Sequence, residues 1–211
     1  MKAILFFILL ALNLPCEAQS SVRQKSISLN NKAIKVSREL GDRNKKLKQA
    51  NLILDSAIRI DPTNLMPYTN KLNNLIALKE YESAIEVTNS ALKVKPVLEL
   101  LTAKGALLQK TGNLSEARQM YKKALNFGQN TYKLKPSSTL LCNLAVLHNL
   151  LEGKKKTLEF LNLEKANFAN DPRGLKNIEA FEKILPNLTV DKILGIQANS
   201  TSPQMLRAME L

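Results

Sequence analysis

The sequence predicts an all-α protein built from repeated pairs of helices. Three pairs of matching residues stand 34 positions apart: Pro62 and Pro96, Ala50 and Ala84, Ala57 and Ala91. Residues 65–96 contain two short amphipathic helical patterns followed by a proline. A fixed period of this length, with small residues and a terminal proline, is typical of helical repeat arrays.

The second repeat, residues 65–96, gives the clearest pair of helices. A turn is expected between them at Lys79 and Glu80. The second helix carries Ala84 and Ala91, where bulky residues would cost about 1–3 kcal/mol of overpacking strain if two helices meet there. These alanines therefore predict a closely packed antiparallel pair.

The third repeat begins near Leu98 and has a glycine inside its first helix. Gly105 costs about 1 kcal/mol there relative to alanine, and a close helix crossing would explain it. Gly112 can take the left-handed conformation that a turn requires. Asn113, followed by Glu116, predicts a capping box at the start of the next helix.

The first and fourth repeats are less regular. In the first, a helix over about residues 27–40 leads to a turn at Gly41, and the next helix is expected to be one turn longer than its counterpart. In the fourth, a turn at Gly153 precedes a helix over about residues 156–169. The sequence thus predicts three to four helix pairs.

A capping helix and a tail should follow the repeats. Asp171 is expected as the N-cap and Pro172 as the first residue of a helix that ends near residue 185. Residues 187–211 are interpreted as a partly flexible tail, with a short helical turn at 190–196 and a flexible stretch at 197–203. The repeat domain itself is assigned to residues 19–186.

The N-terminus predicts export. Residues 3–14 are almost entirely apolar, about as long as a signal h-region and too short to span a bilayer. Small residues at Cys16 and Ala18 fit cleavage after Ala18, so residues 1–18 are interpreted as a signal peptide of a periplasmic or secreted protein. The alternative is a lipoprotein cut before Cys16, although the residues just before that cysteine are not the small ones a lipobox requires.

The chain is strongly basic, with a formal net charge of +13. The lysines form short clusters, such as residues 154–156, that suit either a solvated helix face or attraction to acidic lipid or cell-wall polymer. Nucleic acid is not an expected partner, because no aromatic residues interleave with the clusters and no binding motif is present. Peripheral association with the cell envelope is the remaining alternative.

The sequence predicts no enzyme, no cofactor and no metal. His148 is the single histidine, and Cys142 is the single cysteine once the signal peptide is removed, so a conventional zinc site cannot form. Both lie in an apolar run and are interpreted as packed residues. The glycines follow no phosphate-loop pattern.

The array resembles the tetratricopeptide repeat family. That family has a small residue at the eighth position of each repeat, alanines at the twentieth and twenty-seventh, and a proline at the thirty-second. Gly105, Ala117 and Ala124 fit this pattern in the third repeat, although Gln129 stands in place of the proline. The resemblance covers about residues 42–127 and is weak over 128–170.

The resemblance implies a right-handed superhelix of helix pairs. In this family the first helices line a concave groove that binds an extended peptide or a partner helix. On the family's spacing, the groove positions of the second and third repeats are Thr69, Asn70, Asn73, Ile76, Ala77, Thr102, Ala106, Gln109 and Lys110. The expected function is therefore a non-enzymatic scaffold or protein-binding module, with an envelope-bound structural protein as the alternative.

Overall fold

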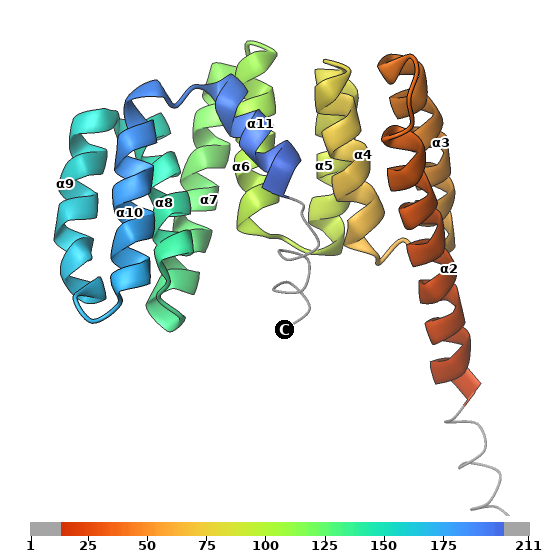
Figure 1. Ribbon diagram of the computed structural model, residues 1–211, viewed down its shortest axis with the longest axis horizontal. Coiled ribbons are helices and arrows are strands. Elements are labelled where there is room, and N and C mark those ends of the chain that lie inside the picture. Colours follow the sequence, from red (N-terminus) through yellow and green to blue (C-terminus); the bar gives the residue numbers. More distant parts are fainter. Residues whose placement is uncertain (1–13, 201–211) are drawn as a thin grey trace, which may run out of the picture. The chain divides into compact units, whose positions relative to one another are not determined.

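The computed structural model describes residues 14–200 of the chain (Figure 1). Over this range the helices are joined by short turns and loops and there is no β-strand, so the all-α prediction is confirmed. It divides into two compact units, one ending at Glu80 and the other comprising residues 81–200.

The first unit has three described helices, which lie side by side in Figure 1: α2 (Leu14–Ser37), α3 (Arg43–Ile60) and α4 (Leu65–Ala77). α2 packs against α3, and α4 packs against both. The extra turn predicted for the first repeat is confirmed, because α3 has 18 residues and the matching helix α5 (Tyr81–Val94) has 14. Gly41 and Lys79 form the expected turns with positive φ angles of 121° and 61°.

α2 differs from its sequence prediction. It begins at Leu14 instead of near residue 27 and ends at Ser37 instead of at residue 40. The apolar pattern underestimated the helix because part of its buried face is polar: Ser26 and Asn30 are fully buried. Pro15 stands in the first turn, where its missing N–H has no intrahelical partner to lose. Residues 1–13, most of the predicted signal peptide, lie outside the described residues, and export stays a prediction.

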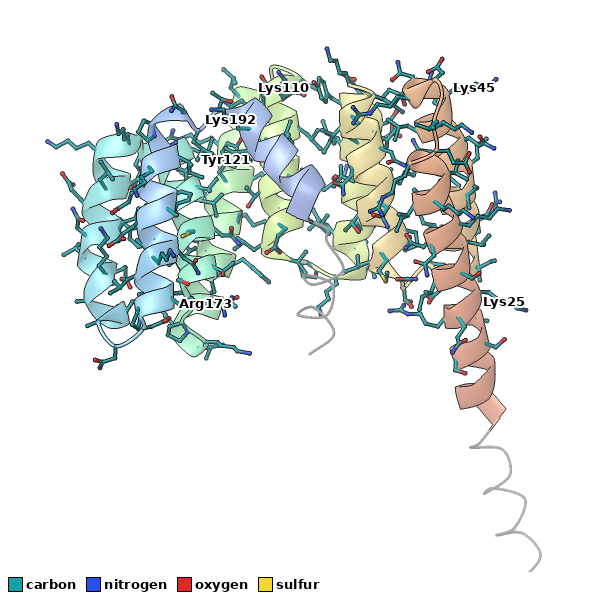
Figure 2. The ribbon with its side chains drawn as sticks, viewed as in Figure 1. Lys25, Lys45, Lys110, Tyr121, Arg173 and Lys192 are labelled. Atoms are coloured by element: carbon teal, nitrogen blue, oxygen red, sulfur yellow. The ribbon has the colours of Figure 1, made fainter. Side chains whose placement is uncertain are left out.

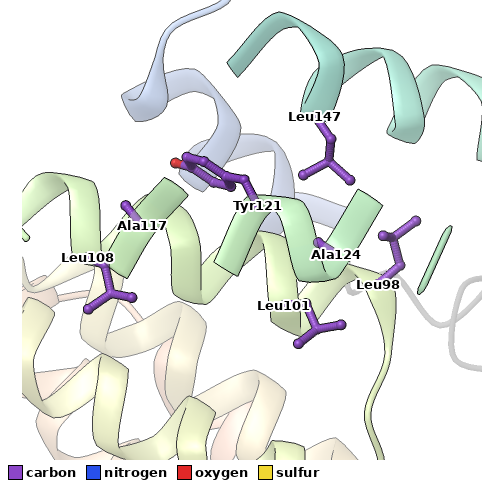
Figure 3. Close-up of a cluster of buried hydrophobic side chains, with 7 residues drawn as sticks. All are labelled: Leu98, Leu101, Leu108, Ala117, Tyr121, Ala124 and Leu147. Carbon is purple, nitrogen blue, oxygen red and sulfur yellow. The ribbon is translucent and has the colours of Figure 1, made fainter. Parts of the chain in front are cut away.

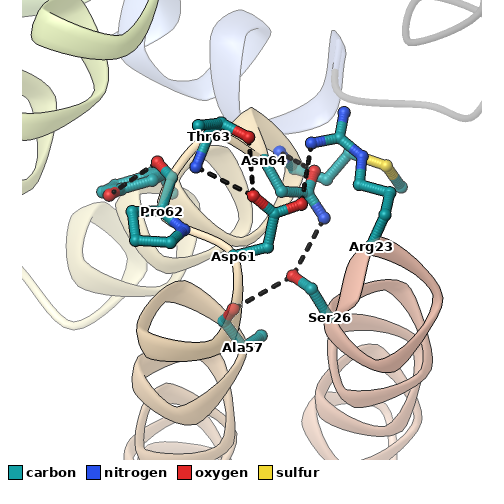
Figure 4. A network of polar contacts seen from close by, with 9 residues as sticks. Arg23, Ser26, Ala57, Asp61, Pro62, Thr63 and Asn64 are labelled. Atoms are coloured by element: carbon teal, nitrogen blue, oxygen red, sulfur yellow. Dashed lines mark hydrogen bonds and ion pairs between the residues drawn. The ribbon is translucent and has the colours of Figure 1, made fainter. Parts of the chain in front are cut away.

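A polar network holds the start of α2 against the turn after α3 (Figure 4). The Arg23 guanidinium donates to Asp61 Oδ2 at 3.0 Å, and the Thr63 hydroxyl donates to Asp61 Oδ1 at 2.6 Å. Asn64 Nδ2 donates to Ser26 Oγ, which in turn donates to a backbone carbonyl of α3, both at 3.0 Å. Burial would raise the pKa of Asp61, but the hydrogen bonds from Thr63 and Arg23 outweigh it and hold the pKa below its ordinary value.

The second unit, residues 81–200, begins with α5 and continues through six more α-helices: α6 (Leu98–Lys110), α7 (Leu114–Leu134), α8 (Ser138–Glu152), α9 (Lys154–Lys165), α10 (Pro172–Ile184) and α11 (Val190–Ser200). Short 3-10 turns at Ala166–Phe168 and Leu185–Asn187 flank α10. From α5 to α9 each helix packs on the next, which is the arrangement that helical hairpin repeats produce.

The core of the third repeat lies between α6, α7 and α8 (Figure 3). Its buried members are Leu98, Leu101, Leu108, Ala117, Tyr121, Ala124 and Leu147. Gly105 faces this core, and a Cβ at that position would lie 2.4 Å from Tyr121 Cε1 and 2.5 Å from Tyr121 Cδ1. The predicted close helix crossing at Gly105 is therefore confirmed.

α7 continues beyond the usual end of a repeat. Gln129 stands where the repeat pattern has a proline, so the helix runs on to Leu134, just before Pro136. Gly128 lies in this stretch, and an added Cβ would come within 2.7 Å of Leu144 Cδ2 in α8. Without a proline at position 129, α7 is longer, and α8 packs against this additional part of it.

The capping box predicted at Asn113 is wrong. Asn113 does precede α7, but its side chain makes no hydrogen bond to the first turn of that helix. Gly112, with a φ of 84°, turns the chain back, so the Asn113 N–H donates to Leu108 O at 2.8 Å. The Asn113 side chain then donates to Thr111 Oγ1 at 3.1 Å instead of capping α7.

The helix after the repeats caps the array as predicted. Asp171 Oδ1 accepts a hydrogen bond from the Gly174 N–H at 2.8 Å, and Pro172 is the first helical residue. α10 packs on α8 and α9. The buried cluster on this side consists of Leu141, Ala145, Leu161, Phe168, Ile178, Phe181 and Leu185.

Candidate functional site

The C-terminal segment folds as a helix and packs on α6 (Figure 1). The short helical turn expected at 190–196 lies within α11, which extends to Ser200; residues 201–203 lie outside the described range, and the flexibility of 197–203 stays a prediction. Thr189 starts the helix by accepting the Lys192 N–H on its hydroxyl at 3.3 Å. Ile193 and Leu194 are each 2% exposed, so tertiary packing holds this helix in place.

α6 has two opposite faces. Leu98, Leu101, Gly105 and Leu108 face α7, as described above. The opposite face, here called the small-residue face, consists of Glu99, Ala103, Ala106 and Lys110, which recur at helical spacing. Ala103 and Ala106 are 2% and 0% exposed although they point away from α7.

Lys110 connects the small-residue face to α11. Its ammonium lies 2.7 Å from Asp191 Oδ1, in the first turn of α11. The same ammonium stands 5.7 Å from the centre of the Tyr81 ring, within cation–π range. The hydrogen bond with Asp191 raises the pKa of Lys110, so its ammonium stays charged at neutral pH. This ion pair joins the first turn of α11 to the Lys110 end of the small-residue face.

The other predicted groove residues of α6 are already engaged. Thr102 is buried, and its hydroxyl donates to Leu98 O at 2.9 Å. Gln109 Oε1 accepts the Tyr121 hydroxyl at 2.9 Å, and burial raises the pKa of that tyrosine. Thr102 and Gln109 therefore help to fix the surface on which α11 lies.

The predicted groove residues of the second repeat all lie on α4, in the first unit. Thr69 is buried and donates its hydroxyl to a carbonyl one turn back in the same helix, at 2.9 Å. Asn70 donates from Nδ2 to Asn30 Oδ1 in α2 at 2.7 Å. Asn73 and Ile76 are half-buried on the same helix. α4 thus presents a partly polar surface whose Asn70 side chain has a fixed orientation.

Polar contacts between helices of the first unit were missed by sequence reasoning. Asn74 Nδ2 donates to Asn51 Oδ1 at 2.9 Å, and Lys71 lies 2.5 Å from Asp55 Oδ1. Asn30 is fully buried, and its Nδ2 has no hydrogen-bond partner. The only available signal was the presence of asparagine at positions where a repeat helix normally has an apolar residue.

His148 and Cys142 belong to residue types that often act in catalysis, but both are packed against other side chains. His148 stacks on Phe160, with ring centres 4.3 Å apart, and its Nδ1 lies 3.1 Å from Glu152 Oε2. The sequence predicted apolar surroundings for His148, but the Glu152 carboxylate also lies beside its ring. The hydrogen bond with His148 lowers the pKa of Glu152. Burial raises the pKa of Cys142 to about 11, so its thiol is protonated at neutral pH.

Over residues 14–200 no cluster of acidic, histidine or cysteine side chains could hold a metal ion. The same range contains no helix with the length and apolarity needed to cross a bilayer.

Basic side chains are spread over the surface of both units. Lys25 and Lys45 in the first unit and Arg173 and Lys192 in the second are exposed (Figure 2). The lysine cluster at residues 154–156 is exposed as well and forms the first turn of α9, which has no acidic residue. These charges are available to solvent or to an acidic surface.

Comparison with known proteins agrees with the repeat pattern. Residues 98–127, which comprise α6 and much of α7, match the family model described as tetratricopeptide repeat. The predicted resemblance is thereby confirmed on the third repeat. The chain is also similar to a solved structure described as "Crystal structure of YrrB: a TPR protein with an unusual peptide-binding site", with 16% identity and a TM-score of 0.46 over 92% of this chain and 97% of that one.

Proposed function

We propose that this chain is a non-enzymatic interaction module that binds a peptide or a helix of a protein partner along the first helices of its repeats. The observation that carries the proposal is α11, which lies on α6 with two buried aliphatic side chains and an ion pair to Lys110. A first helix of this array thus has a surface on which another helix packs, and this supports the proposal. Helical hairpin repeats, and the family match on residues 98–127, support the same class of function.

The proposal concerns two separate sets of predicted groove residues, one on α4 in the first unit and one on α6 in the second, and each set is proposed as a binding surface by itself. Side chains held by internal hydrogen bonds, such as Asn70 and Gln109, lose little conformational entropy when a ligand binds. An amide that already uses one donor still has further hydrogen-bonding capacity for a peptide backbone. We place this activity outside the cytoplasm, in the periplasm or the medium, with anchoring through a lipid on Cys16 as the less favoured form.

Peptide selection on the full chain tests the proposal. Short random peptides would be selected for binding, and their affinities measured by fluorescence anisotropy at about 50 and about 500 mM NaCl. We expect affinities that fall less than tenfold with salt, because burial and hydrogen bonding dominate. Asn70→Ala and Asn73→Ala should weaken binding, whereas Asn126→Ala, on an exposed site of α7, should not.

Thermal unfolding of each variant separates lost binding from lost folding, since Asn70→Ala also removes the partner of buried Asn30. If both asparagine variants bind every selected peptide as tightly as the unmodified chain, the groove proposal fails.

A second candidate function is association with an acidic surface. The net charge of +13 and the exposed lysines at residues 154–156 favour it. Binding to vesicles of anionic phospholipid would then fall by orders of magnitude over the same salt range, because each neutralised phosphate releases a counterion. Vesicle binding without any peptide binding would support this candidate over the first.

A further inference from the structure

α11 has little helix propensity of its own and depends on its packing against α6. It has 11 residues, and isolated helices shorter than about 12–15 residues are marginal in water. Gly195 lies in its middle, where glycine is a poor helix residue. A Cβ on Gly195 would meet no atom within 4 Å, so packing does not require the glycine. An undocked α11 should therefore be largely unfolded.

The small-residue face of α6 is well suited to a helix. Ala103 and Ala106 let a second backbone approach closely, and Lys110 at one end supplies a positive charge. Asp191 in the first turn of α11 pairs with Lys110 in the last turn of α6, so the two helices run in opposite directions (Figure 1). Negative charge in a first turn also complements the helix dipole, and this contact therefore selects the direction of the bound helix.

From these features we infer that the small-residue face of α6 is a helix-binding site that α11 occupies in the free protein. Its partner is a protein segment of the same chemistry: a short helix with an acidic residue in its first turn, one spacer residue, and two adjacent aliphatic residues. This pattern is that of Asp191, Ile193 and Leu194. The inference rests on the proposed function and deepens it, because it names the partner's chemistry and makes α11 its internal competitor.

Competition within one chain predicts how affinity should change. A partner binds only the fraction of molecules in which α11 is undocked, so its apparent Kd rises as that fraction falls. Gly195→Ala should favour helical α11 by the difference in helix propensity, which corresponds to about a fivefold change in the docking equilibrium. In the chain this substitution should weaken partner binding about fivefold, whereas in a partner peptide it should strengthen binding.

The experiment uses a fluorescent synthetic peptide of residues 188–200 and the full chain. We expect weak binding to the unmodified chain and at least tenfold tighter binding to an Ile193→Asp/Leu194→Asp chain, in which α11 is released. Gly195→Ala should weaken peptide binding when it is made in the chain and strengthen it when it is made in the peptide. Leu163→Asp, an aliphatic-to-acidic change at an exposed position of α9, is the matched control and should leave peptide binding within twofold of the unmodified chain.

Charge reversal checks the site. An Asp191→Lys peptide should lose affinity for the released chain and regain it when that chain carries Lys110→Glu. Circular dichroism of each variant shows whether the chain remains folded, and the Gly195→Ala pair requires no disruptive change. The inference is overturned if released and unmodified chains bind the peptide equally, or if release of α11 produces a dimer on gel filtration and no peptide binding.

Failure here is distinguishable from failure of the proposed function. If randomly selected peptides bind the unmodified chain but the peptide of residues 188–200 binds no variant, the module still binds partners and only the role of α11 is wrong. If no peptide of any sequence binds either form, both proposals fail.

Discussion

The close crossing at Gly105 allows one substitution to be worked through in numbers. Gly105→Ala would place a Cβ 2.4–2.5 Å from the Tyr121 ring, a distance at which the ring must move. Tyr121 is buried between α6 and α7, and its hydroxyl donates to Gln109, so little room is available. Overpacking of this kind costs about 1–3 kcal/mol. Alanine returns about 1 kcal/mol of helix propensity, so we expect a net loss of up to about 2 kcal/mol.

Urea unfolding of the full chain, monitored by the helix signal in circular dichroism at about 222 nm, measures this loss. Gly195→Ala is the matched control because it also places alanine inside a helix, while its Cβ would meet nothing within 4 Å. The control should be neutral or stabilising by up to about 1 kcal/mol. The reasoning is refuted if Gly105→Ala is as stable as the control.

A double-mutant cycle tests the cause of the loss. In a Tyr121→Leu background the ring is gone, so Gly105→Ala should no longer be destabilising there. A coupling energy near zero between the two substitutions would mean that the alanine acts elsewhere than on the ring.

Three further predictions concern other buried groups. Leu161→Ala should destabilise the chain by about 2–5 kcal/mol in urea unfolding, because Leu161 is 0% exposed under α10; a loss below about 1 kcal/mol would contradict this packing. Because the pKa of Asp61 is lower in the folded chain than its value of about 3.8 in the unfolded chain, ionised Asp61 stabilises the fold. This stabilisation is fully present above the unfolded pKa and is lost as the pH falls through the folded pKa. Asp61→Asn should therefore flatten the decline in stability between about pH 5 and pH 2, and an unchanged profile would argue against the network with Arg23. Alkylation of Cys142 by iodoacetamide at about pH 8 should be slower than that of free cysteine by on the order of a hundredfold, because its pKa is about 11; equal rates in folded and urea-unfolded chains would contradict its burial.

Much of the repeat architecture could be predicted because its signals are local. The prolines after the first two repeats, the glycine turn at Gly112 and the N-cap at Asp171 each act within one turn of a helix. Gly105 was informative for the opposite reason, since a residue that is costly in a helix needs a compensating contact. The ring of Tyr121 is that contact.

Sequence reasoning failed where tertiary packing or polar burial outweighed the local signal. The first helix was predicted too short because Ser26 and Asn30, which read as surface residues, are buried and, in part, hydrogen-bonded to other helices. At Asn113 the capping pattern was present, but the turn at Gly112 used the asparagine in another way. Both errors come from polar side chains that have more than one hydrogen-bonding solution.

α11 shows why the binding surface itself was the hardest part to predict. The sequence predicts only a short helical turn at 190–196, whereas α11 extends over Val190–Ser200 and packs on α6 with Ile193 and Leu194 buried. The groove positions Ala106 and Lys110 were predicted from the family's spacing, but nothing local indicated that a segment 80 or so positions further along the chain would lie over them. The weak local signal of α11 and its proposed exchange with a partner have one physical cause, because a helix that depends on its docking surface unfolds when another helix takes that surface.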